Sequence, residues 1–265
     1  MMDYSGYKFL AIDVKDGIAF ITINRPEKMN ATDREGHGEL PKILRDLALD
    51  DEVKVAVVTG AGKAFSIGGD LEMMEQMNAH PEQLIGLLDE ARELVNAHID
   101  LEKPIIAAIN GYAMGAGAIF GLLCDFVIAE RKAKMADGHV RAAVAAGDGG
   151  ALLWPLTMGL AKAKRYLLTG DWITAEEAER VGLITEVVEN GESLKRATQI
   201  AKRLVAGPQT AIRYTKRALN QWLRMGGAAV FDYSLALEMM TFVTDDTKNA
   251  IKDLKAKGPG AIPPE

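Results

Sequence analysis

Two glycine-rich turns carry the residues of this sequence that are best suited to chemistry. The first spans residues 63–71 and the second spans residues 110–118, and each lies between a short β-like run and a helix-like segment. The start of a helix leaves backbone N–H groups without partners and carries the positive end of the helix dipole. Glycine allows a ligand to approach the backbone closely. Two such turns side by side predict a site that stabilises one developing oxyanion.

A histidine and an aspartate supply candidate acid–base groups. His139 lies in the segment 135–141 and Asp148 lies in the glycine turn 146–150, with Asp137 nearby. Histidine titrates near neutral pH and can act as a base or an acid. Two alternatives stay open at this point. Asp148 can be a capping residue for the apolar helix that follows it, and His139 can be a hydrogen-bonded structural residue.

Other patterns of known chemistry are absent from the sequence. The four histidines form neither H-x-x-H nor H-E-x-x-H, so no metal site is predicted. Phosphate-binding-loop and G-x-S-x-G patterns are missing as well. His80 and His98 are expected at the surface of a helical stretch. Cys124, the single cysteine, lies in an apolar run and is expected to be a buried, inert thiol.

Alternating strands and helices are predicted to position these turns. Residues 9–13 and 18–23, joined by a Lys-Asp-Gly turn, predict a hairpin. Apolar and β-branched runs predict further strands, and helical periodicity predicts intervening helices. The strands are expected at 53–59, 105–109 and 126–129, and the helices at 34–49, 81–101 and 116–123. This alternation implies parallel β–α units, that is, an α/β fold.

The last quarter of the chain is predicted to be helical, since strand patterns disappear from about Leu194. Helices are expected at 195–204, 210–223, 230–241 and 250–257. Their apolar residues need cover from some other surface. These residues are Met225, Val230, Phe231, Leu235, Met239, Met240 and Phe242.

Composition is ordinary for a globular protein. The chain has 265 residues, 48% of them hydrophobic and 26% charged, with a net charge of −6. A negative charge argues against nucleic acid as the main partner, while a local lysine patch is enough for an anionic cofactor. One cysteine and the lack of an apolar leader fit a cytoplasmic protein. No uninterrupted apolar stretch is long enough to predict a membrane span.

Five motifs, in order along residues 10–257, resemble those of the enoyl-CoA hydratase/isomerase family, also called the crotonase superfamily. Residues 25–31 are similar to its R-P-x-x-x-N-A motif, and residues 64–71 to A-F-x-x-G-x-D-L. Residues 103–111 with 124–125 resemble K-P-x-x-A-x-x-N-G … C-D. Residues 169–183 and 244–246 match its T-G … A-x-E-A … G-L and T-x-D motifs.

The resemblance implies a fold and an assembly. The fold is a crotonase-like spiral of repeated β-β-α units, with a C-terminal helical oligomerisation region. Residues 1–193 would form the α/β core with the CoA-thioester site, and residues 194–265 a helical trimerisation region. The expected assembly is a homotrimer or a hexamer formed by two trimers.

The resemblance also implies a substrate and the residues that bind it. The substrate would be an acyl-CoA ester in fatty acid metabolism, with coenzyme A as part of the substrate and no permanently bound cofactor. The oxyanion hole would consist of the N–H groups of Ser66 and Ala116. Lys28 and Lys63 would either contact CoA phosphates or be solvated, and Asp70 is expected foremost as a helix N-cap. The remaining residues implied for CoA-thioester binding are Met29, Ala31, Ala64, Gly68, Gly69, Leu71, Gly115, Phe242 and Lys257.

The sequence departs from the family at its acid–base positions. Hydratases of the family carry two glutamates there, and the corresponding positions hold Ile119 and His139. The favoured function is therefore hydration or double-bond isomerisation with His139 and Asp148 as non-standard proton-transfer groups. The alternatives are a CoA-ester hydrolase, a C–C lyase or a decarboxylase on the same scaffold, or a non-catalytic acyl-CoA-binding protein.

Overall fold

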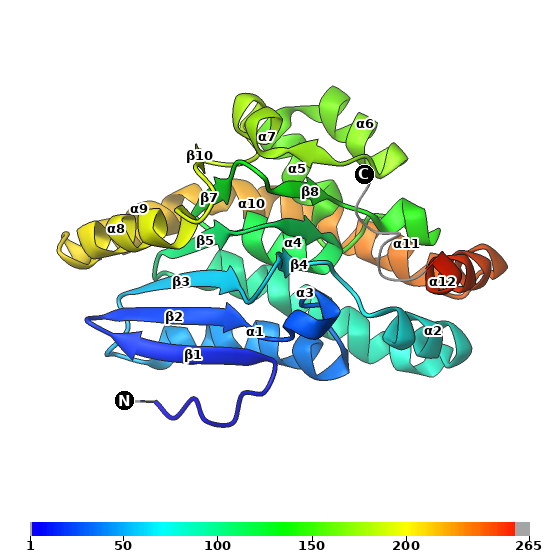
Figure 1. Cartoon of the computed structure of the whole chain (residues 1–265), viewed down its shortest axis with the longest axis horizontal. Coiled ribbons are helices and arrows are strands. Elements are labelled where there is room, and N and C mark those ends of the chain that lie inside the picture. Colours follow the sequence, from blue (N-terminus) through cyan, green and yellow to red (C-terminus); the bar gives the residue numbers. More distant parts are fainter. Residues whose placement is uncertain (1, 258–265) are drawn as a thin grey trace.

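The fold contains two β-sheets, and the chain passes repeatedly from one sheet to the other. The computed structural model describes residues 2–257 (Figure 1). A six-stranded sheet has the order β1-β2-β3-β5-β7-β10, and a four-stranded sheet has the order β4-β6-β8-β9. The strands are β1 (Leu10–Lys15), β2 (Ile18–Ile23), β3 (Val55–Gly60), β4 (Ala64–Ser66), β5 (Ile105–Ile109), β6 (Tyr112–Met114), β7 (Phe126–Glu130), β8 (Lys134–Ala136), β9 (Ile173–Thr174) and β10 (Glu186–Val188).

Helices follow the strands in a repeating pattern. Each of the pairs β3–β4, β5–β6 and β7–β8 places its first strand in the large sheet and its second in the small sheet, and helical structure follows. This is the expected spiral of β-β-α units. The helices are α1 (Arg34–Leu49), α2 (Leu71–Ala79), α3 (Leu84–Asp100), α4 (Gly115–Leu122), α5 (Gly150–Met158), α6 (Leu160–Thr169), α7 (Ala175–Val181), α8 (Ser193–Val205), α9 (Gln209–Leu219), α10 (Gln221–Gly226), α11 (Asp232–Phe242) and α12 (Asp245–Lys257).

The predicted N-terminal elements are confirmed. β1 and β2 pair antiparallel, and β2, β3, β5 and β7 pair in parallel. Successive side chains of a strand point to opposite faces. On β3, Val55 and Val57 pack with Ala197 and Ala201 of α8, whereas Ala56 and Val58 belong to the main core. The large sheet is therefore covered on both faces.

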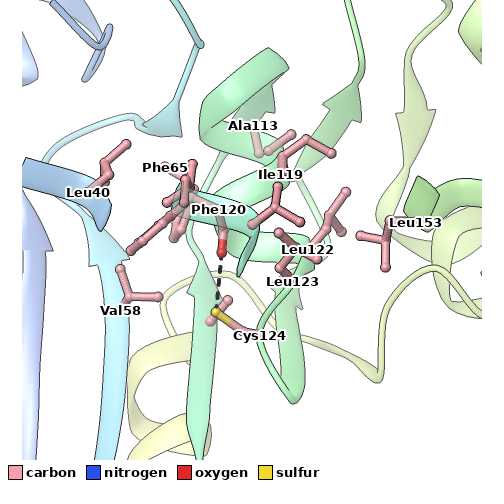
Figure 2. Close-up of a cluster of buried hydrophobic side chains, with 14 of the residues drawn as sticks. Leu40, Val58, Phe65, Ala113, Ile119, Phe120, Leu122, Leu123, Cys124 and Leu153 are labelled. Atoms are coloured by element: carbon pink, nitrogen blue, oxygen red, sulfur yellow. Dashed lines mark hydrogen bonds between the residues drawn. The ribbon is translucent and has the colours of Figure 1, made fainter. Parts of the chain in front are cut away.

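α4 is the most deeply buried helix of the site region. All eight of its residues are buried. Figure 2 shows Ile119 and Phe120 among apolar side chains from several elements, with the Cys124 thiol donating to the Phe120 carbonyl at 3.4 Å. Burial raises the pKa of this thiol, as expected for an inert cysteine.

His98 was expected at the surface, and this prediction is wrong. The ring lies on the inner face of α3, 2% exposed, with Nδ1 3.0 Å from the Leu94 carbonyl. It also packs edge-on against Phe120, with the ring centroids 5.1 Å apart. Burial lowers its pKa to about 4, so the imidazole is neutral. His98 occupies the apolar stripe of α3 as an aromatic side chain, which explains why polarity misled the prediction.

The helices after β10 wrap back over the sheets and the site. α8 covers the large sheet, and α12 lies beside α2 (Figure 1), where Lys255 pairs with Glu75 at 2.6 Å. Phe231, Leu235, Met239 and Phe242 are buried, which supplies part of the predicted cover. The predicted division between residues 193 and 194 stays a prediction, and residues 258–265 of the second region lie outside the described residues. Within residues 2–257, no helix is both long and apolar enough to cross a bilayer.

Candidate active site

The two glycine-rich turns are in contact. Gly68 has φ +82°, and a Cβ atom on it would lie 2.8 Å from the Met114 carbonyl oxygen and 3.4 Å from Cα of Gly115. Such a φ and such a close approach both require glycine. The start of α4 therefore lies directly against the turn that follows β4.

The amide of Gly69 lies at this junction. On either side of it, Thr32 N–H donates to the Gly68 carbonyl at 2.7 Å and Asp70 N–H donates to the Thr32 carbonyl at 3.0 Å. The Gly69 N–H itself has no acceptor within residues 2–257. Ala116 occupies the second position of α4, where an N–H group lacks an intrahelical partner. Both residues line the same cavity.

Ser66 is not among the described residues that line this cavity, whereas Gly68 and Gly69 are. Ser66 is fully buried in β4 and pairs with Ala113 of β6. Its hydroxyl donates to the Asn30 carbonyl at 2.7 Å and accepts from the Gly68 N–H at 3.3 Å. The structure thus places Ser66 as a support for the turn, three residues before the amide that faces the cavity.

Asn30 fixes the loop of residues 25–31 against the first turn. Its side-chain amide donates to the carbonyls of Ala61, Ala64 and Phe65 at 2.9, 2.8 and 3.2 Å. Its φ of +58° fits asparagine better than most residues. Three residues implied for CoA binding gather beside it: Met29, Ala31 and Ala64 pack together with Ile67.

The other implied CoA residues lie around the cavity mouth or at the surface. Asp70 caps α2, accepting from the Glu72 N–H at 2.8 Å, as expected, and pairs with Arg25 at 2.7 Å. Lys28 is exposed and lies 3.8 Å from the Glu72 carboxylate. Leu71 and Phe242 line the cavity. Lys63 and Lys257 are exposed.

A buried ionisable cluster forms one wall of the cavity. After β8, Asp137 and Gly138 lead into the short helix η3 (His139–Ala142). His139 Nδ1 lies 2.8 Å from Asp137 Oδ1, and Nε2 lies 3.4 Å from Asp148 Oδ2. Asp148 is not a helix cap: Gly149 is the N-cap residue of α5, without a side-chain hydrogen bond. The structure therefore brings the two predicted acid–base groups together.

These carboxylates change the ionisation of the histidine. Burial opposes a charge on His139, but the charges of Asp148 and Asp137 outweigh it and hold the pKa of the imidazole well above its usual value. One side-chain nitrogen or oxygen atom from each of Asp137, His139 and Asp148 lies within 4.8 Å of the other two. The hydrogen bond and ion pairs among them account for that spacing.

Two further polar side chains reach the site without having been predicted there. Glu238 of α11 places Oε1 3.8 Å from His139 Nε2. His37 of α1 lines the cavity, and the nearby charges on Glu90 and Asp148 only partly offset burial, which lowers its pKa. Both occupy the apolar stripe of their helices, Glu238 between Leu235 and Phe242. A polar side chain within such a stripe is the signal that could have revealed them.

Apart from Arg141, the remaining side chains that line the cavity are apolar, and the cavity volume is about 100 Å³. The methionine-rich start of α2 forms part of the wall through Met73 and Met74. Ile119, Phe120 and Trp154 belong to the core and are not among the described residues that line the cavity. The further apolar side chains of the wall are Leu71, Leu87, Ala91, Met114, Met239, Phe242 and Leu254.

Comparison with known proteins shows the family to which the chain belongs. The sequence model of the enoyl-CoA hydratase/isomerase family matches residues 13–260. The chain belongs to this family. It is 33% identical over 243 residues to the short-chain-enoyl-CoA hydratase of Clostridium acetobutylicum, covering 89% of this chain and 91% of that protein.

Solved structures share the fold closely. An enoyl-CoA hydratase/isomerase from Mycobacterium paratuberculosis superimposes with a TM-score of 0.91 at 34% identity, covering 95% of this chain and all of that one. A beta-diketone hydrolase from Anabaena sp. PCC 7120, bound to (S)-3-oxocyclohexyl acetic acid, superimposes with a TM-score of 0.84 at 27% identity. That match covers 91% of this chain and 96% of the hydrolase.

Proposed function

We propose that this protein acts on an acyl-CoA thioester through an enolate held by two backbone amides. The observation that carries the proposal is the contact between the two glycine turns, which sets the N–H groups of Gly69 and Ala116 in the same cavity as His139 and Asp148. Negative charge develops on the thioester oxygen when a proton is removed, or water added, next to the carbonyl. Preorganised N–H donors stabilise that charge more than the ground-state carbonyl. Gly69 takes the place that the sequence motif suggested for Ser66.

The proton-transfer groups are His139 and Asp148. The carboxylate of Asp148 accepts a proton from the attacking water or from the substrate carbon. The imidazolium of His139 donates a proton to the α carbon of the enolate, or to the γ carbon in an isomerisation. After each turnover, the proton passes from Asp148 back to His139 across the contact of 3.4 Å between them. Ile119, at the position of a family glutamate, lies in the core (Figure 2) and takes no part.

The coenzyme A moiety is assigned to the surface around the first turn. Met29, Ala31 and Ala64 form an apolar patch beside Gly68 and Gly69. The exposed amines of Lys28 and Lys257 are available to phosphate groups. The acyl group would enter the apolar cavity, whose methionines suit a bulky or variable chain.

Turnover of a panel of enoyl-CoA and acyl-CoA esters tests the proposal. Loss of the conjugated enoyl thioester is followed optically, and mass spectrometry identifies the products. We expect His139→Ala and Asp148→Asn each to lower kcat by about 10²-fold or more. Full activity of both variants on a substrate that the wild type converts would refute the assignment. Tight acyl-CoA binding without any product would instead support the non-catalytic alternative.

A second candidate is hydrolysis of a carbon–carbon bond in a 1,3-dicarbonyl compound. Two observations favour it: the His139–Asp148 pair can activate water, and the fold is similar to that of a beta-diketone hydrolase. Water would add to one carbonyl and lose a proton to Asp148. The bond to the central carbon would then break, giving a carboxylic acid and an enolate, and His139 would protonate the enolate carbon. Incorporation of ¹⁸O from labelled water into a new carboxylate distinguishes this reaction from isomerisation.

A homotrimer, or a hexamer formed by two trimers, remains the expected assembly. Large apolar side chains of the C-terminal helices support it, since Trp222, Met225, Tyr233 and Met240 are each about two-thirds exposed in the single chain. A cytoplasmic location and a role in fatty acid metabolism complete the proposal. Sedimentation velocity of the purified protein tests the assembly.

A further inference from the structure

Helix α11 delivers a third carboxyl group to the imidazole of His139. Glu238 is 4% exposed, and its Oε1 lies 3.8 Å from Nε2, the ring nitrogen that Asp148 Oδ2 approaches to 3.4 Å. Within residues 2–257, the second oxygen, Oε2, has no hydrogen-bond partner. Asp148 Oδ1 is likewise buried without one. Both residues line the cavity, so two neighbouring carboxyl groups border it.

The position of Glu238 is fixed by contacts between α11 and the loop that carries Asp148. A Cβ atom on Gly147 would lie 2.6 Å from Cβ of Glu238 and 2.4 Å from the Ser234 carbonyl, so the loop can approach α11 only with glycine there. The Ser234 hydroxyl donates to the Gly147 carbonyl at 3.2 Å. The Ala145 N–H donates to the Thr241 hydroxyl at 3.0 Å. Asp148 and Glu238 are thus held as a pair.

Burial and the neighbouring charges favour a protonated Glu238. Asp148, His139 and Asp137 are the ionisable groups that face Glu238. On the helices packed against α11, Arg92 of α3 pairs with Asp232 and Lys255 of α12 pairs with Glu75. Arg141 and His37 also line the cavity, but within residues 2–257 neither forms an ion pair with these carboxyl groups, so three carboxylates would face one buried imidazolium. Glu238 is the most distant of the three from the imidazole, and burial and then the Asp148 charge raise its pKa well above the usual value, which favours its neutral form.

A neutral and an ionised carboxyl group side by side can bind one water molecule in a reactive orientation. The water donates one hydrogen to the Asp148 carboxylate and accepts a hydrogen bond from the Glu238 carboxyl. Its remaining lone pair is then free to attack the substrate. Ile119 and His139 occupy the positions of the two family glutamates, so sequence position alone suggests that no such carboxyl pair exists.

We propose that Glu238 is a catalytic residue that binds the reacting water together with Asp148, its protonated carboxyl group donating to the water oxygen. The loop before α5 then supplies one carboxyl group and a C-terminal helix supplies the other. Together they replace the two glutamates that the sequence lacks at the family positions. The proposal rests on the proposed function, in either its hydration or its hydrolysis form.

Three variants test it on the substrate that the wild type converts. Glu238→Gln keeps a neutral donor, so we expect kcat within about tenfold of wild type. Glu238→Leu removes the donor and should lower kcat by about 10²-fold or more, with little change in KM. Thr241→Val is the control, since it loosens the same loop without removing a carboxyl group. Wild-type activity in Glu238→Leu, or an equal loss in Thr241→Val, would overturn the proposal.

Deuterium exchange at the α carbon of butyryl-CoA in D₂O separates water binding from enolate formation. This exchange needs the oxyanion hole and a base but no attacking water. Glu238→Leu should lower water addition at least tenfold more than it lowers exchange, whereas equal losses of the two reactions would assign Glu238 a structural role. Absence of both reactions in the wild type would instead refute the proposed function.

A measurement without substrate tests the protonation of Glu238. Because the pKa of Glu238 is raised in the folded protein, the folded state keeps this proton at pH values where an unfolded chain has lost it. The free energy of unfolding of the wild type should therefore decrease as pH rises from about 4.5 through the raised pKa. Glu238→Gln has no proton to lose and should lack this part of the decline. Parallel stability curves for the two proteins would show Glu238 to be ionised and would overturn the proposal.

Discussion

Asp137 Oδ1 lies 2.8 Å from Nδ1 of His139, and this contact leaves Nε2 as the ring nitrogen that faces Asp148. Asp137 is 2% exposed and follows β8 directly, so the sheet fixes its carboxylate. A carboxylate on Nδ1 selects the orientation of the ring and stabilises its charged form. The proposed acid–base chemistry at Nε2 would therefore depend on a residue on the far side of the ring.

Replacing Asp137 with asparagine should impair catalysis without removing a reacting group. The Asp137→Asn variant would keep the size of the side chain but lose its charge, so the pKa of His139 should fall and kcat should decrease by about 10²-fold or more. Titration of the His139 ring followed by ¹⁵N NMR measures the first effect, and turnover measures the second. The matched control is Asp171→Asn, an exposed carboxylate outside the site. An unchanged ring titration would contradict this account of His139.

Stability should depend on pH through His139. Its pKa is raised in the folded protein above the ordinary value of 6.5, so protonation stabilises the folded state. That stabilisation is complete below about pH 6.5 and is lost as pH rises through the raised value. His139→Gln should remove this part of the dependence, which thermal unfolding at a series of pH values records. A His139→Gln profile that declines like the wild type over the same range would show that another group is responsible.

Much of the fold could be predicted from residue patterns, because the strands of the large sheet are continuous apolar runs. α1 was predicted at its observed bounds, and β2, β3, β5 and β7 within two residues. The small sheet was missed, because β4, β6, β8 and β9 have only two or three residues each. A segment of that length shows no periodicity, and tertiary contacts decide its conformation.

The site was only partly predictable for a related reason. Family motifs located both glycine turns. They also located His139 and Asp148, which lie in neighbouring segments of the sequence. Choosing between the amides of Ser66 and Gly69 required the path of the backbone within the turn. Glu238 is 90 residues from Asp148, and although the resemblance brought Phe242 of α11 to the site, it gave no indication that Glu238 faces His139. Long-range packing of this kind is set by the whole fold.

The contact between the two turns can be tested at Gly68. Gly68→Ala places a Cβ atom 2.8 Å from the Met114 carbonyl at a φ of +82°, so it should cost about 1–3 kcal/mol in the free energy of unfolding and lower kcat by displacing the Gly69 amide. Gly159→Ala is the control, because Gly159 has a φ of +80° and no heavy atom within 4 Å of such a Cβ. Urea unfolding compares the two. Equal stability losses with equal activity would show that the turn contact has no role in catalysis.

Restoring a glutamate at position 119 should harm the protein rather than improve it. Ile119 is 1% exposed in the core that Figure 2 shows, and its Cγ2 atom would lie 2.9 Å from a Cβ on Gly149. A carboxyl group there would be buried within the hydrophobic core, so Ile119→Glu should lose about 3–5 kcal/mol of stability. Ile119→Val, which removes one methyl group, should lose about 0.5–1.5 kcal/mol and keep turnover. Unfolding in urea and turnover of the same preparations measure both effects. A stable Ile119→Glu variant with faster hydration would show that the family position still reaches the substrate and that the Asp148 and His139 assignment is wrong.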